Sequence, residues 1–156
     1  MSPRAARWVR AAGLLLARLF LGGLFVYASL HKLADPVSFS RIVYGYKILP
    51  PWAINLTAIV LPGVELAAGA LLLAGLLRRG AALAVSLSLL VFICALAFNL
   101  ARGLDFDCGC FSFARTGPGA ALDLLVRDVV FLALSCWVLL SPECPCSADR
   151  LLGRDA

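Results

Sequence analysis

Four apolar stretches, each long enough to cross a bilayer, dominate this chain of 156 residues. A spanning helix needs roughly 20 predominantly apolar residues. The candidates are residues 11–30, 54–77, 80–101 and 120–141. A backbone in lipid must satisfy its own hydrogen bonds, so such stretches fold as helices. The sequence therefore predicts an all-α integral membrane protein, a four-helix transmembrane bundle that forms one domain over residues 1–156.

The overall composition agrees with a lipid environment. Apolar residues make up 62% of the chain, whereas soluble domains contain about 45–50%. The formal net charge is +5, but the basic residues flank the apolar stretches and form no stripe that would bind nucleic acid. We therefore expect a lipid bilayer as a partner, and no nucleic acid.

The first apolar stretch has one alternative interpretation, a cleaved signal peptide. Three arginines precede it, and the sequence "VYA" at residues 26–28 would satisfy a small-residue cleavage rule. However, the stretch exceeds the usual apolar length of about 7–15 residues, and Arg18 interrupts it. A retained spanning helix is the favoured interpretation.

The distribution of Lys and Arg predicts the orientation. Arg78 and Arg79 alone would join the second and third helices, and this short basic turn favours the cytoplasm. Both termini are then cytoplasmic, including the tail 142–156. The loops 32–53 and 102–119 face outward, where a bacterial compartment permits disulfides.

The second helix carries two features that bear on packing. Pro62 should kink the helix because it removes one backbone hydrogen bond. Small residues recur at helical spacing at Gly63, Ala67, Ala70 and Ala74. Such a face lets another helix approach closely, so we expect it to be a packing face.

A paired cysteine motif, "FDCGCFSF" at residues 106–113, interrupts the apolar pattern. A disulfide between Cys108 and Cys110 would close a very small ring, and Gly109 supplies the freedom to bend that the ring needs. Strained disulfides exchange readily. A structural disulfide gains most by closing a long loop, so this pair suits thiol–disulfide exchange better than a structural role.

Two other interpretations of the pair stay open: a metal site and no chemistry at all. Two thiolates supply only half of a tetrahedral zinc site. Cys144 and Cys146 lie on the opposite side of the membrane in the predicted topology, and His31 would add one ligand from the outer end of the first helix.

Ionisable residues inside spanning helices are costly, which makes them candidates for function. We expect Glu65 to pair first with Arg18, and Arg127 to pair with Asp123 because the two are four residues apart on one helix. A proton or quinone site under the outer loop is the functional interpretation. A structural ion pair is the alternative, and it is the favoured one.

Three further residues are candidates near the cysteine loop. His31 and Lys32 would either line the redox loop or anchor the interface. Cys94 lies about 10 Å below the outer end of the third helix at 1.5 Å per residue. It is a candidate relay for a disulfide from the loop, although a buried free cysteine is also common. Cys136 receives no role.

Several motifs together resemble a known family. In order, the chain carries Arg18, Gly22, Phe25, "HKLADPVSF" (31–39), Tyr44, Pro50, "LPGVEL" (61–66), Gly69, "CGCF" (108–111) and "RD" (127–128). This ordered set, from about residue 14 to 140, resembles the MauE branch of the DoxX-like membrane proteins. The family usually has Gly after the motif "CGCF", whereas this chain has Ser112 after Phe111, and the tail with Cys144 and Cys146 matches no family pattern.

The resemblance implies a bacterial inner-membrane protein of four helices. It further implies a link to maturation of the disulfide-rich small subunit of methylamine dehydrogenase, beside a thioredoxin-like extracytoplasmic partner. Cys108 and Cys110 would carry thiol–disulfide exchange for a cysteine-rich secreted client. Two other classes stay open: a non-catalytic assembly factor whose cysteines bind a client or metal, and a quinone-linked oxidoreductase subunit, which a bound quinone would favour.

Overall fold

The computed structural model describes residues 3–102 and 120–141, and these residues form five α-helices. The helices are α1 (Pro3–Ala34), α2 (Pro36–Gly45), α3 (Pro51–Ala74), α4 (Arg78–Ala101) and α5 (Ala120–Leu140). The predicted all-helical class is confirmed for this part of the chain. Three helices, α1, α3 and α4, are long and apolar enough to cross a membrane.

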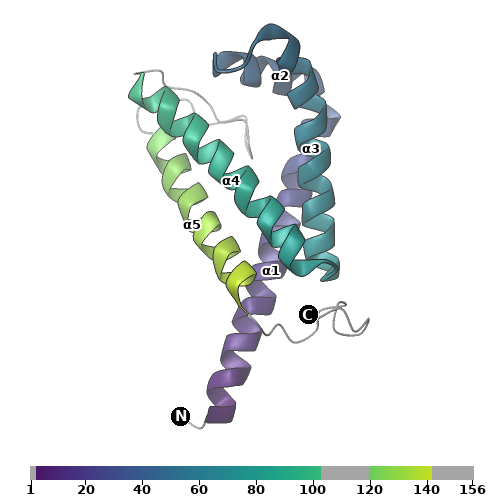
Figure 1. Cartoon of the computed structure of the whole chain (residues 1–156), viewed down its shortest axis with the longest axis vertical. Coiled ribbons are helices and arrows are strands. Elements are labelled where there is room, and N and C mark those ends of the chain that lie inside the picture. Colours follow the sequence, from purple (N-terminus) through teal and green to yellow (C-terminus); the bar gives the residue numbers. More distant parts are fainter. Residues whose placement is uncertain (1–2, 103–119, 142–156) are drawn as a thin grey trace.

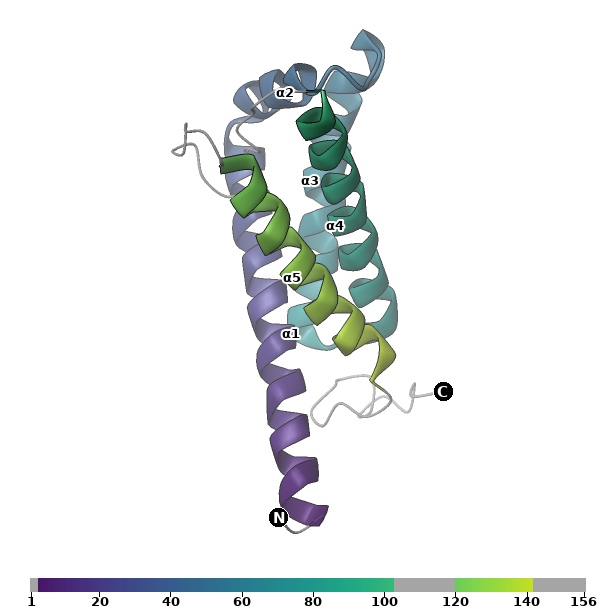
Figure 2. The ribbon, with the colours of Figure 1, turned by 90° about the vertical axis from the view of Figure 1, so that its left-hand side faces the viewer.

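The long helices lie side by side and alternate in direction (Figures 1 and 2). The start of α1, the α3–α4 turn and the end of α5 lie toward one end of the bundle. Helix α2 lies across the opposite end, where α4 also finishes and α5 begins. Helix α1 packs mainly against α3, and α4 packs mainly against α5. This arrangement agrees with the prediction that the start of the first helix, the region of Arg78 and Arg79, and the end of the last helix lie on one side.

The core is apolar and draws side chains from all four long helices. It contains Ala17, Leu21, Phe25, Ala68, Leu72, Ala81, Ala82, Val85, Leu89 and Val138. Leu21, Phe25 and their neighbours make α1 an integral part of this core. The first apolar stretch is therefore part of a packed helix, and the sequence at 26–28 that would fit a cleavage rule lies within that helix.

Polarity is distributed in the opposite sense to that of a soluble protein. Several charged residues are buried, among them Arg18, Lys32, Glu65 and Asp128, whereas large apolar side chains cover much of the surface. Exposed apolar patches of this extent are a liability in water. In a bilayer they face lipid tails, so the arrangement suits a membrane solvent.

The turn between α3 and α4 differs from the expected one. Gly75 takes a left-handed conformation with φ of 70°, and it ends α3 three residues before the predicted boundary at residue 77. Glycine adopts this conformation without the Cβ penalty, which is why it commonly ends helices. Arg78 and Arg79 consequently form the first turn of α4 rather than the connection.

Helix α2 lies in the segment 32–53 that we expected to be a loop. Asp35 caps its start, because its side chain accepts a hydrogen bond of 3.0 Å from the backbone nitrogen of Ser38. Pro36 occupies the first turn, where its missing N–H costs nothing. Hydrogen bonds from Ser38 hold the pKa of the exposed Asp35 carboxyl below its usual value.

The expected packing face of α3 is wrong. Gly63, Ala67, Ala70 and Ala74 are exposed, and a Cβ added at Gly63 would meet nothing within 4 Å. The face that packs instead carries Glu65, Ala68, Gly69 and Leu72, among other buried residues. The helix continues through Pro62, which is buried within it. Small residues therefore lie on both the packed and the exposed side of this helix, and the buried carboxylate of Glu65 distinguishes the packed side.

Candidate functional site

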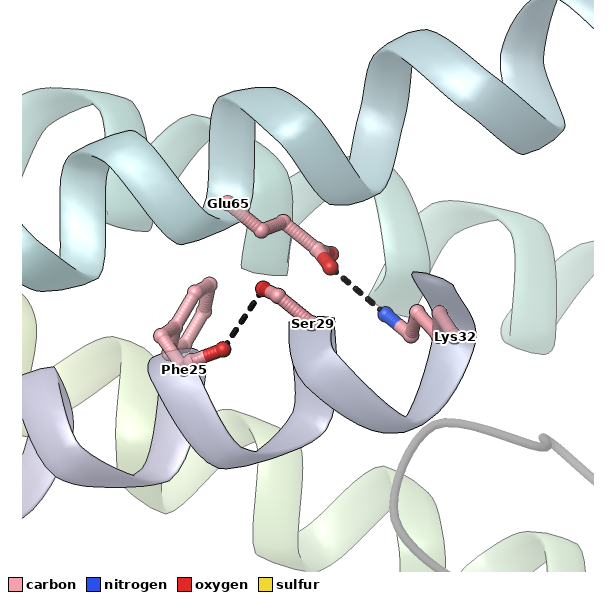
Figure 3. Close-up of polar contacts among 4 residues, drawn as sticks. All are labelled: Phe25, Ser29, Lys32 and Glu65. Carbon is pink, nitrogen blue, oxygen red and sulfur yellow. Dashed lines mark hydrogen bonds and ion pairs between the residues drawn. The ribbon is translucent and has the colours of Figure 1, made fainter. Parts of the chain in front are cut away.

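A buried ion pair joins the last turn of α1 to the middle of α3. The Nζ atom of Lys32 donates a hydrogen bond of 2.7 Å to Oε2 of Glu65, as Figure 3 shows. The two side chains are only 4% and 2% exposed. Ser29, which lies beside the pair, hydrogen-bonds the carbonyl of Phe25 within α1 at 2.6 Å (Figure 3). A charge pair this deeply enclosed is strongly coupled, because little water screens it.

This pairing corrects the expected pair of Glu65 with Arg18, and helix geometry explains the difference. Helices α1 and α3 run antiparallel, with Gly22 beside Gly69. From that contact, Glu65 lies about 6 Å toward the α2 end and Arg18 about 6 Å toward the other end. Side chains tilt toward the N-terminus of their own helix. Arg18 and Glu65 therefore point away from each other, whereas Lys32 points back along α1 toward Glu65.

A second ion pair lies on α5 and also differs from expectation. Arg127 donates from Nη2 and Nε to Oδ1 of Asp128, at 2.9 and 3.1 Å. Asp128 is 1% exposed, whereas Asp123, the expected partner of Arg127, is exposed. A buried carboxylate depends on a counter-charge far more than a solvated one. Arg127 therefore pairs with the buried Asp128 next to it in the chain, and not with the exposed Asp123 four residues before it.

The two pairs meet at one small cavity, and together they form what we call the charge cluster: Lys32, Glu65, Arg127 and Asp128. The cavity measures about 10 Å³ and is lined by Phe25, Ala28, Lys32, Glu65, Leu89, Phe92 and Asp128. That volume is roughly the space that one water molecule requires. The cluster contains two cationic and two anionic side chains, so its formal charge is zero. It ties α1, α3 and α5 together and offers acidic and basic groups around one solvent-sized space.

Two aromatic rings complete the environment of Lys32. Its Nζ atom lies 5.2 Å from the ring centroid of Phe39 on α2 and 4.8 Å from that of Phe92 on α4. Both distances fall within the range of cation–π attraction, about 6 Å. The ammonium group is therefore held by one carboxylate and two rings from three different helices.

Tyr46, at the end of α2, lies close to the same cluster. Burial, together with the negative charge of Asp128, raises the pKa of Tyr46 to about 12. The phenol thus stays neutral through the physiological range.

The remaining predicted residues within the described part of the chain lie apart from the cluster. His31 is exposed, and its Nε2 hydrogen-bonds the hydroxyl of Tyr27 at 3.0 Å. Cys94, the candidate relay, is a free thiol on the exposed side of α4. Arg18 is buried at 4% exposure, nearer the opposite end of α1. The structure brings Lys32 and Glu65 together beside Asp128, which is the partner of Arg127, and leaves His31, Cys94 and Arg18 outside.

The predicted redox pair lies outside the described residues. This applies to Cys108, Gly109, Cys110 and Phe111, and also to the tail cysteines 144 and 146. Within residues 3–102 and 120–141, the structure brings together no three His, Cys, Asp or Glu residues that could hold a metal ion. The zinc alternative depends on the cysteines of the loop and therefore stays a prediction.

Sequence reasoning missed Asp128, the most buried member of the charge cluster. The sequence predicts Asp123, and not Asp128, as the partner of Arg127. The signal that identifies Asp128 is an acid directly beside a base inside an apolar helix.

A second buried cation, outside the charge cluster, lies at the opposite end of the bundle. The sequence predicts Arg78 only as a signal of orientation. In the structure Arg78 is 5% exposed, and its Nη1 donates to the carbonyls of Val138 and Ser141 at 3.2 and 2.8 Å.

Comparison with known proteins gives consistent matches. The family described as "Methylamine utilisation protein MauE" matches residues 10–141. The methylamine utilization protein MauE of Paracoccus denitrificans is 41% identical over 119 residues, which cover 76% of this chain and 63% of that protein. The protein of the same name from Methylophilus methylotrophus is 29% identical over 129 residues, 82% of this chain and 68% of that protein. The chain thus spans about two thirds of the length of these relatives. No solved structure matches it.

Proposed function

Because the chain belongs to the MauE family, we propose that it is a membrane thiol–disulfide redox protein with a role in methylamine utilisation. In this proposal, Cys108 and Cys110 exchange electrons with an extracytoplasmic partner. The exchange supports disulfide formation or maturation of a cysteine-rich secreted client, beside a thioredoxin-like protein. We place the family within the DoxX-like membrane proteins on the ordered motifs of the sequence.

One observation carries the proposal: the connection that bears the cysteine pair is attached at the end of the bundle where the charge cluster lies. Helix α4 ends at Ala101 and α5 begins at Ala120, both at the α2 end (Figures 1 and 2). Lys32, in the last turn of α1, belongs to the same end, and it pairs with Glu65 in the middle of α3. Exchange proceeds through a thiolate, and formation of a thiolate releases a proton. A buried cluster of acids and bases near this attachment suits proton handling for such a reaction.

The same proposal assigns a membrane topology. Helix α5 is taken as the fourth spanning helix, since Arg127 and Asp128 neutralise each other inside it. The α2 end then faces outward and both termini face the cytoplasm of a bacterial inner membrane, as the arginine bias indicates. In intact cells after mild reduction, a membrane-impermeant maleimide should label the pair 108/110 and spare 144/146. Labelling of the tail pair alone would contradict this orientation.

Trapping of a mixed disulfide tests the redox proposal. Exchange passes through a disulfide between the two proteins, which a neighbouring thiol then resolves. Of the variants Cys108→Ser and Cys110→Ser, one should accumulate a reducible adduct with a secreted or thioredoxin-like protein. Non-reducing gels with mass spectrometry identify the adduct.

The chain offers its own control for this experiment. Cys94→Ser removes a free, exposed thiol of α4 and should leave the adduct unchanged. If the adduct disappears when Cys94→Ser is added to the loop variant that traps it, this would instead support the relay role of Cys94. A reduction potential of the pair below about −300 mV, the range of structural disulfides, with no adduct from either loop variant, would overturn the redox proposal. The assembly-factor and metal-binding alternatives would then remain.

A further inference from the structure

A second, larger cavity lies between α2, α3 and α4, separate from the charge cluster. Its volume is about 150 Å³. It is lined by Phe39, Ile42, Val43, Tyr46, Ile48, Leu49, Thr57, Leu61, Val91, Phe92 and Ala95. No charged side chain lines it, and only Tyr46 and Thr57 carry a polar group. The lining therefore selects against an ionic ligand, because a charge would lose its hydration without gaining a partner.

The position of the cavity determines which molecules can reach it. Three residues of the lining are also exposed: Ile48 by 45%, Leu49 by 38% and Val91 by 60%. The cavity consequently opens onto the apolar outer surface of the helices. In a membrane, this surface is covered by lipid, so a ligand that enters here must dissolve in lipid.

The size and the walls narrow the ligand class. An engineered apolar cavity of about 150 Å³ in another protein stays free of water and binds benzene. Here three of the lining side chains are aromatic: Phe39, Tyr46 and Phe92. Aromatic rings pack favourably against one another in offset or edge-on geometries. A single flat ring therefore suits both the volume and the walls.

We propose that this cavity is a binding site for one six-membered ring of an uncharged, lipid-soluble molecule. The inference goes beyond the proposed redox function, because it uses none of the cysteines. Ligand binding would also be linked to the charge cluster. Phe39 and Phe92 form walls of the cavity and at the same time hold the ammonium group of Lys32. A ring that fixes these two side chains would stabilise the arrangement around Lys32 and Glu65.

Fluorobenzene, followed by fluorine NMR with the full chain in detergent micelles, is a direct probe. The wild-type protein should give a saturable bound signal above the partitioning background of empty micelles. Ala95→Phe fills the cavity and should weaken binding roughly tenfold or more, which corresponds to about 1.4 kcal/mol. Ala97→Phe places the same ring on an exposed position of α4 outside the lining and should bind as the wild type does.

The proposal would be overturned by the absence of a saturable signal from folded wild-type protein, or by equal binding by Ala95→Phe and Ala97→Phe. A linear alkane that displaces fluorobenzene at equal concentration would show that the cavity takes an acyl chain instead of a ring. Circular dichroism and chromatography verify that each variant folds. If Ala95→Phe does not fold, Val91→Trp obstructs the opening from an exposed position, with Leu90→Trp as its control. Weaker binding by Val91→Trp alone would support the site, and equal binding by the two would refute it.

Discussion

Gly22 on α1 and Gly69 on α3 contact each other backbone to backbone. A Cβ added to either glycine would lie 3.0 Å from the carbonyl oxygen of the other. Real Cβ atoms rarely come this close to a carbonyl oxygen, so the contact depends on both residues being glycine. Small residues at membrane helix interfaces allow such close approach. This contact determines the register of α1 on α3, and the register in turn places Lys32 opposite Glu65.

The first prediction concerns this contact. Gly22→Ala should destabilise the protein by about 1–3 kcal/mol, the usual cost of overpacking, because its Cβ would also lie 2.8 Å from the side chain of Leu73. Gly23→Ala is a matched control on the same helix, since its Cβ would meet nothing within 4 Å. Reversible unfolding in mixed micelles measures both. Equal stability of the two variants would mean that the glycine contact is not required.

The second prediction concerns the buried ion pair. Glu65→Gln leaves the ammonium group of Lys32 without its counter-charge and should cost about 3–5 kcal/mol of unfolding free energy. The double variant Lys32→Met with Glu65→Met removes both charges and should recover much of this loss. A double-mutant cycle on unfolding free energies measures the coupling. Arg18→Met with Glu65→Met serves as the comparison, and better recovery from that variant would contradict the observed pairing.

A third prediction concerns Arg78, which caps the end of α5. Its guanidinium satisfies the carbonyls of Val138 and Ser141, and a cation at a helix C-terminus also complements the helix dipole. Arg78→Gln should therefore lower stability by about 1.5–3 kcal/mol, the range for hydrogen bonds to charged groups. Arg79→Gln removes the same charge from the same turn but from an exposed position. If both variants lose equal stability, the effect comes from charge and not from the cap.

The fourth prediction concerns pH. The pKa of Tyr46 is raised from 10.0 to about 12 by burial and by the charge of Asp128. The unfolded chain releases this proton near pH 10, whereas the folded protein retains it until about pH 12. Stability should therefore fall as the pH rises from about 10 to 12, and Tyr46 should contribute no further change above that. The loss is on the order of 2–3 kcal/mol.

Ultraviolet titration of the phenols measures the same group directly. The titration of the wild-type protein should contain a component that ionises late, and the titration of Tyr46→Phe should lack that component. Tyr46→Phe should also lose the corresponding fall in stability. A titration curve that is the same shape in both proteins would contradict the assignment.

The sequence predicted the long helices well, because their apolar stretches depend on local composition alone. The starts of α4 and α5 lie close to the predicted ones. The failures arose where the outcome depends on neighbouring helices. Gly63 and Ala67 looked like a packing face, but the close approach occurs at Gly22 and Gly69, and spacing within one helix does not reveal which face meets a partner.

The ion pairs show the same limit. Glu65 is buried and ion-paired, but its partner depends on the register of α1 against α3, which helix positions counted from the membrane centre do not determine. In contrast, α2 was predictable in principle. Asp35 followed by Pro36 is a common helix start, and both residues lie within the quoted motif "HKLADPVSF".

The pairing of Lys32 with Glu65 also has a consequence for how the chain enters the membrane. A charged residue in the middle of a spanning helix opposes insertion by about 2.5–3.5 kcal/mol on translocon scales. Synthesis proceeds from the N-terminus, so α1 is already in place when α3 emerges. The ammonium group of Lys32 is then within reach of the Glu65 carboxylate. The carboxylate can therefore enter the lipid already paired with a positive charge. The order of the two residues along the chain thus lets α1 assist the insertion of α3.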